Sequence, residues 1–168
     1  LGPISGAHFN PAVTLAFLLR KEISPALAVV YMAVQVIGCV AGAWLAHLMF
    51  ELPMLQIATT DRSGFAKILA ESVATFALVF AIFGAIRYAP KSVAAAVALV
   101  IMAGYWWTSS TSFANPAISI ARALSDSFAG VNPANLPGFI IGQFIGAIAA
   151  TGLSAVLFTP EKPSKTGK

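Results

Sequence analysis

Four long apolar runs constrain the fold of this chain more than any other feature of its sequence. Each is close to, or longer than, the roughly 20 residues that a helix needs to cross the hydrocarbon core of a bilayer. Charged residues make up only 10% of the chain, against about 25% in a soluble domain. Because a lipid-exposed segment must satisfy its backbone internally, the sequence predicts an all-α membrane protein with spanning helices at residues 25–50, 67–86, 90–107 and 136–158.

The basic residues lie in the breaks between these runs and near the end of the chain, and they form no patch typical of nucleic-acid binding. We therefore expect a lipid bilayer and no nucleic acid as partner. Cytoplasmic segments carry an excess of lysine and arginine, so the side with more of them, which includes a tail at residues 159–168, is predicted to be cytoplasmic. That side carries Arg20, Lys21, Arg87, Lys91, Lys162, Lys165 and Lys168, and the other carries Arg62, Lys67 and Arg122.

Two shorter apolar segments, residues 13–19 and 118–124, each follow the tripeptide Asn-Pro-Ala. Residues 10–16 match residues 115–121 conservatively at every position, and residues 35–38 match residues 143–146. The chain therefore contains an internal repeat of a short helix followed by a spanning helix. The paired tripeptides are Asn10, Pro11 and Ala12 in the first copy and Asn115, Pro116 and Ala117 in the second.

The topology of this repeat is predicted to be inverted. Three spanning helices lie between the two short segments, so the second segment enters the bilayer from the opposite face. Paired broken helices in the two halves of an inverted repeat indicate a pathway near the midplane. Symmetry also predicts two helices, about 40 residues or more, ahead of the first tripeptide, so we expect an N-terminally incomplete chain, either a fragment or a natural truncation. Its single domain, residues 1–168, comprises the rest of the first repeat (1–50), the second repeat (67–158) and the tail.

The Asn-Pro-Ala tripeptide has the chemistry of a helix start. Asparagine is a good N-cap, and proline suits the first helical position. A helix N-terminus carries partial positive charge and unpaired N–H donors, so two such ends meeting in the bilayer would repel cations and offer donors to a passing oxygen. A third copy, at residues 132–134, has no repeat partner and is predicted to be a turn that starts a helix.

Three segments resemble signatures of the aquaporins, or major intrinsic proteins: residues 5–14, residues 71–76 and residues 112–117. The resemblance implies six spanning helices, two half-helices, one pore in each subunit and a homotetramer, with the first two helices absent here. It also implies that Glu71 is buried and braces a half-helix loop rather than carrying protons. Backbone carbonyls around two stretches would line the pore, namely Gly6, Ala7 and His8, and Ser110, Thr111 and Ser112.

The resemblance further implies an outer constriction, and here the chain departs from the family. Most members have arginine directly after the second tripeptide, where this chain has Ile118. Counting back from Asn115 places the other constriction residues at Ser112 and Ala103, or at the equally small Gly104 if the register slips by one. The predicted filter is wider and less polar. It is similar to that of an aquaporin branch associated with arsenic resistance, which implies arsenous acid or methylated metalloids as solutes beside water and glycerol-like polyols.

Several alternatives remain open at this level. The chain is predicted to be a passive channel for small uncharged solutes, but a strict water channel, a non-conducting structural protein that assembles with full-length subunits, or a secondary transporter that uses Glu71 also fits. Arg122 lies on the helical face of Asn115, and a cation that snorkels to the surface is favoured over a charge in the outer vestibule. We expect no enzyme, cofactor or metal site, because no nucleophile–base pair, phosphate-binding loop or ligand spacing is present.

Overall fold

A computed structural model describes residues 1–158, and all regular elements within them are helical. The four predicted spanning helices are confirmed, with boundaries that differ by a few residues, and all four are long and apolar enough to cross a membrane. The predicted cytoplasmic tail, residues 159–168, lies outside the described residues. The long helices are α3 (Pro25–Met49), α4 (Phe65–Tyr88), α5 (Val93–Trp107), which continues a 3-10 turn η1 (Pro90–Ser92), and α7 (Leu136–Leu157).

The two short helices are α2 (Pro11–Leu19) and α6 (Pro116–Ala123), and a single turn, α1 (Gly2–Ser5), precedes them. Both short helices begin two residues before the apolar segments, because proline occupies the first helical position in each. The third tripeptide forms a 3-10 turn, η2 (Pro133–Asn135), that leads directly into α7. The predicted turn and helix start at this tripeptide is therefore confirmed.

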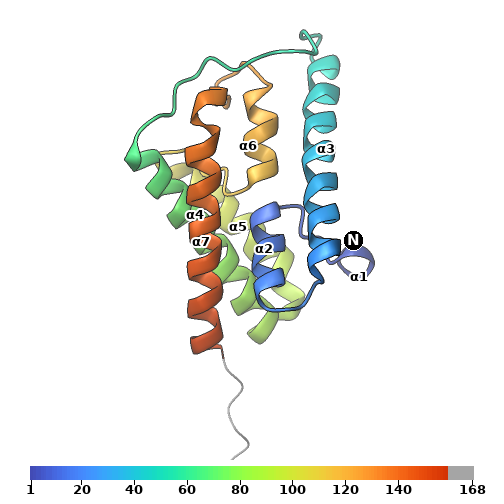
Figure 1. Cartoon of the computed structure of the whole chain (residues 1–168), viewed down its shortest axis with the longest axis vertical. Helices are drawn as coiled ribbons and strands as arrows, with labels where there is room; N and C mark the ends of the chain where they lie inside the picture. Colours follow the sequence, from blue (N-terminus) through green and yellow to red (C-terminus); the bar gives the residue numbers. More distant parts are fainter. Residues whose placement is uncertain (159–168) are drawn as a thin grey trace, which may run out of the picture.

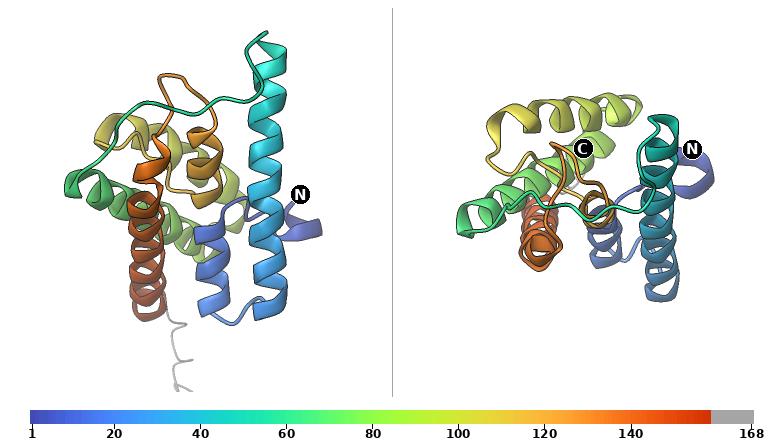
Figure 2. Two further views of the ribbon diagram at one scale, coloured as in Figure 1. Left: turned by 45° about the horizontal axis from the view of Figure 1, so that its top comes forward. Right: turned by 90° about the horizontal axis from the view of Figure 1, so that it is seen from above.

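The short helices lie end to end between α3 and α7, with their first residues facing each other (Figure 1). The packing is crosswise: α6 packs mainly against α3 of the first repeat, whereas α2 packs mainly against α7 of the second. Figure 2 shows α4 and α5 together on one side of this arrangement. Each half of the repeat therefore holds the short helix of the other half in place.

Helices α4 and α7 form the most extensive contact, and glycines allow their close approach. A Cβ atom on Gly146 would lie 2.1 Å from the carbonyl oxygen of Ser72, and one on Gly142 would lie 2.5 Å from that of Ile68. Ser72 Oγ also donates a hydrogen bond to the carbonyl of Gly142 at 2.8 Å. Small residues at such spacing are typical of close helix contacts in membranes.

The two loops that precede the short helices share an unusual backbone. Gly6, Ala7 and Phe9 have φ angles of 76°, 51° and 50°. The equivalent positions of the second copy are Thr111, Ser112 and Ala114, with φ angles of 72°, 52° and 48°. Non-glycine residues rarely adopt positive φ, and each costs free energy unless the surroundings enforce it. The repeat seen in the sequence therefore extends to the backbone, even where the residue types differ.

Candidate functional site

Asn10 and Asn115 join the two short helices at their N-termini. Asn10 Nδ2 donates to the carbonyl oxygen of Ala114 at 2.7 Å, and Asn115 Nδ2 donates to that of Phe9 at 2.9 Å. Each Oδ1 caps its own helix, accepting from the amide of Ala12 at 2.9 Å or of Ala117 at 3.0 Å. Both side-chain amides are therefore held rigidly, and each keeps a second N–H free of these bonds.

Two cavities meet at this junction. The α6-side cavity has a volume of about 350 Å³ and also contacts Ser112, Thr111, Tyr105 and Arg122. The α2-side cavity has a volume of about 290 Å³ and also contacts Gly6, Ala7, His8 and Phe17. Because the same residues form part of both walls, the two cavities adjoin at the asparagines and together outline a candidate path. The shared residues are Asn10, Leu78, Ile101, Asn115 and Ile118.

The structure does not bring Ala103 to this path. Ala103 is exposed on the outside of α5, whereas Ile101 and Tyr105 of the same helix line the α6-side cavity. Gly104 is buried against the loop, where a Cβ would lie 2.3 Å from Ser112 Oγ. Of the two positions counted back from Asn115, Gly104 therefore lies beside the loop residue Ser112, whereas Ala103 lines neither cavity. The other two predicted constriction residues, Ser112 and Ile118, do lie together on the α6-side cavity.

Glu71 lies at the centre of a buried network behind the second loop, with no exposed surface. One carboxylate oxygen accepts from Ser110 Oγ at 2.6 Å and from the amide of Phe113 at 2.9 Å. The other accepts from the amide of Ala114 at 2.8 Å and from Gln143 Nε2 at 2.6 Å. These charge-assisted bonds fix the loop that carries Thr111 and Ser112. Ser110 itself turns to Glu71 and does not line either cavity.

Two glutamines at equivalent positions of the repeat were given no role by the sequence. Gln35 Nε2 donates to Thr14 Oγ1 at 3.0 Å, and that hydroxyl donates to the carbonyl of Asn10 at 3.1 Å. Gln143 Nε2 likewise donates to Ser119 Oγ at 2.8 Å. Each glutamine therefore ties a spanning helix to the first turn of a short helix. The signal for both was already present in the match between residues 35–38 and 143–146.

His8 packs and faces the path at the same time. Its ring stacks on Phe17 at 4.4 Å and on Tyr31 at 5.1 Å, measured between ring centroids. Its Nδ1 lies 3.2 Å from Thr14 Oγ1, and the same ring lines the α2-side cavity. Gly6 and Ala7 line that cavity beside it. Within residues 1–158, aromatic contacts therefore hold the first loop, whereas a buried carboxylate holds the second.

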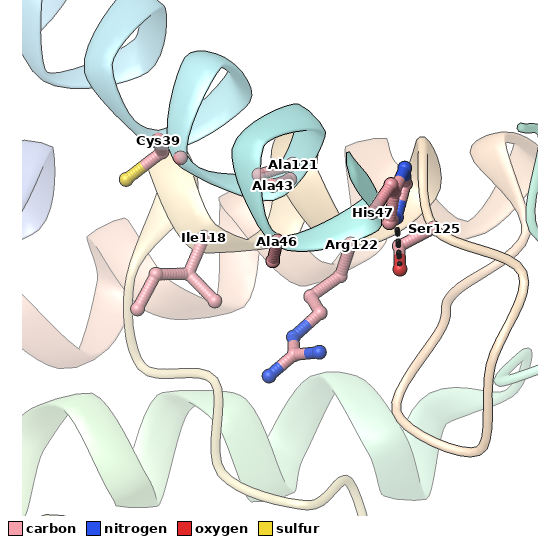
Figure 3. A pocket seen from close by; sticks show the side chains of 9 residues that line it. Cys39, Ala43, Ala46, His47, Ile118, Ala121, Arg122 and Ser125 are labelled. Atoms are coloured by element: carbon pink, nitrogen blue, oxygen red, sulfur yellow. Dashed lines mark hydrogen bonds between the residues drawn. The ribbon is translucent and has the colours of Figure 1, made fainter. Parts of the chain in front are cut away.

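A third cavity, about 260 Å³, lies between α3 and α6 and shares Ile118 and Arg122 with the α6-side cavity. Figure 3 shows His47 at its edge, hydrogen-bonded to Ser125, which follows the end of α6. The buried ring of His47 lies 2.9 Å from Ser125 Oγ and 3.0 Å from the carbonyl oxygen of Met54. This contact joins the end of α3 to the segments that follow α3 and α6, and no sequence pattern indicated it.

Comparisons with known proteins agree with this architecture. A profile of the family described as Major intrinsic protein matches residues 1–91. The protein named Aquaglyceroporin AqpS, from Rhizobium meliloti (strain 1021), is 47% identical over 163 residues, which cover 97% of this chain and 70% of the relative. This chain belongs to the major intrinsic protein family. The membership predicted from the three signature segments is therefore confirmed.

More distant members of the major intrinsic protein family match most of this chain as well. Aquaporin-4 of Homo sapiens is 31% identical over 181 residues, and Aquaporin-5 of Rattus norvegicus is 33% identical over 177. The chain spans 52% of the length of the first and 65% of the second. Together with the four apolar helices, family membership makes this a multi-pass integral membrane protein.

Proposed function

We propose that this chain forms the solute pathway of a passive channel for small uncharged solutes. The observation that supports this proposal best is the junction of Asn10 and Asn115 where the two cavities meet. The N-termini of α2 and α6 direct their partial positive charge at this point. A cation would be repelled there and would also lose its hydrating water. The oxygen of a neutral solute can instead accept hydrogen bonds from the free amide N–H groups.

The wall of the α6-side cavity supports passage of solutes larger than water. Ile118 offers no hydrogen bond, whereas arginine would present a charged fork of donors. Thr111 Oγ1 is buried on the same wall with no hydrogen-bond partner among residues 1–158, so a passing solute can provide one. Tyr105 also lines this cavity and brings a phenol hydroxyl to its lining. Glycerol-like polyols fit this wall. The name of one relative, Aquaglyceroporin AqpS, supports the same class of solute.

Neutral metalloid acids such as arsenous acid or its methylated forms are the further solutes that we propose. They are small, uncharged and rich in hydroxyl oxygens, so the chemistry that suits glycerol suits them. We also propose that the two repeats act as one channel unit in the bilayer and assemble as a homotetramer. The exposed apolar side chains of α3 and α5, such as Leu45 and Leu99, support contact with lipid or with other subunits.

The test is stopped-flow swelling of proteoliposomes that contain the full-length gene product carrying this chain. Water, glycerol and arsenous acid are compared in the native protein, in Ile118→Arg and in empty vesicles. We expect all three solutes to enter through the native protein, and the arginine variant to keep water flux while slowing glycerol and arsenous acid. Equal loss of all three in the variant would favour a structural defect.

The alternatives predict different results in the same experiment. Fast water flux without glycerol flux in the native protein would support a strict water channel. An inserted tetramer with no flux above empty vesicles would support the non-conducting structural protein. Saturable flux that follows a proton gradient would support a secondary transporter. The first outcome would restrict the proposed function to water, and either of the other two would overturn it.

A further inference from the structure

Arg122 lies four residues beyond Ile118 on α6, and both side chains line the α6-side cavity. Figure 3 shows them projecting from the same side of the helix, with the guanidinium group of Arg122 lying toward Ile118. Helical side chains lean toward the N-terminus of their helix. The guanidinium group of Arg122 therefore points along the cavity wall toward the asparagine junction and away from the end of α6.

The guanidinium group of Arg122 has no fixed partner among residues 1–158, where it forms no ion pair or hydrogen bond. The nearest acid in the sequence, Asp126, instead accepts from the amide of Thr59 at 2.9 Å and from its hydroxyl at 3.0 Å. A charged group that is neither paired nor at the surface of a membrane protein typically faces a water-filled path. The group is half-buried, so its donors are available to whatever occupies the cavity.

The two other basic residues predicted on this side of the membrane are occupied. Arg62 donates from Nε to the carbonyl of Gly130 at 2.8 Å and from a terminal nitrogen to that of Phe128 at 2.9 Å. Lys67 Nζ donates to the carbonyl of Ser109. Both therefore hold loops together. Of these three cations, Arg122 is the one that faces the cavity within the described part of the chain.

We propose that Arg122 supplies the fixed positive charge of the outer vestibule, one helical turn beyond the position where Ile118 has none. This proposal rests on the proposed channel function. The guanidinium presents a planar set of N–H donors to the hydroxyl oxygens of polyols or neutral oxygen acids before they reach the asparagines. It also repels organic and inorganic cations at the mouth. This assignment departs from the snorkelling interpretation favoured by the sequence, because the side chain lines the cavity.

The experiment compares Arg122→Gln and Arg122→Lys with the native full-length protein in proteoliposomes, with Lys91→Gln as control. Lys91 is exposed in the 3-10 turn before α5 and lines none of the three cavities. Methylammonium leak and the ratio of glycerol to water permeability are measured. We expect Arg122→Gln to raise methylammonium leak about tenfold. We also expect it to lower the ratio of glycerol to water permeability about twofold. Arg122→Lys should keep cations out, because it retains the charge.

The outcomes distinguish a failure of the Arg122 assignment from a failure of the proposed channel function. If the native protein conducts glycerol and Arg122→Gln changes neither readout, the assignment of Arg122 is wrong while the channel stands. If the native protein conducts nothing, both proposals fall. A second variant, Ile118→Arg with Arg122→Ile, keeps the charge but moves it one turn inward. It should exclude methylammonium again, and leakage through this correctly inserted double variant would also overturn the assignment.

Discussion

Asn10 and Asn115 each donate a hydrogen bond to the backbone carbonyl of the residue that precedes the other. The two bonds are related by the internal repeat, so neither short helix can shift along the path without breaking both. The same asparagines cap their own helices. Capping and joining are therefore performed by one side chain in each half.

The first prediction follows from this double role. Asn10→Ala removes an N-cap, worth about 1 kcal/mol, and also leaves the carbonyl of Ala114 without its donor, at a further cost of about 1–3 kcal/mol. Asn132→Ala is the matched control, because Asn132 caps η2 through a bond to Ala134 at 2.9 Å but joins no second helix. Thermal unfolding in detergent, followed by circular dichroism, should show the larger loss for Asn10→Ala. Equal losses would contradict the joining role.

A second prediction concerns Glu71. Its two oxygens accept four hydrogen bonds. Glu71→Gln therefore points an amide N–H group at neighbours that are themselves hydrogen-bond donors. We expect a destabilisation of about 3 kcal/mol or more, together with loss of glycerol flux as the loop loosens. The exposed Glu51→Gln removes the same charge at the surface and should change neither. A folded Glu71→Gln protein that keeps glycerol flux but loses proton dependence would instead identify Glu71 as a proton carrier.

The glycine contacts of α7 give a third prediction. Gly146→Ala forces α4 and α7 apart, because its Cβ would lie 2.1 Å from the Ser72 carbonyl. Overpacking of this kind costs about 1–3 kcal/mol or more. Gly152 lies on the same helix with nothing within 4 Å of its Cβ position, so Gly152→Ala should be neutral. Size-exclusion chromatography after heating measures both variants, and equal retention of folded protein would show that this contact tolerates separation.

Sequence patterns predicted the fold better than the site. Hydropathy and the paired tripeptides gave four spanning helices and two capped short helices, because length and capping are local properties. Glu71 was assigned through family resemblance alone, since its partners Ser110 and Gln143 lie far from it in the chain. The positive φ angles of Ala7 and Ser112 leave no mark in the residue types. Counting back from Asn115 left Ala103 and Gly104 open because an irregular loop precedes Asn115, and the structure places Gly104 against Ser112.

The last prediction concerns the face of α5 that lines the cavities. Val93, Val97, Ile101 and Tyr105 recur at four-residue spacing along the two cavities, and Ala103 lies off this stripe. Tyr105→Ala should therefore widen the α6-side end and raise glycerol permeability several-fold relative to water, because a large side chain and its hydroxyl leave the wall. Ala103→Val adds volume only on the exposed face of α5 and should leave the ratio unchanged. Swelling assays with both variants decide the register of α5: a response to Ala103→Val without one to Tyr105→Ala would restore the register counted from Asn115.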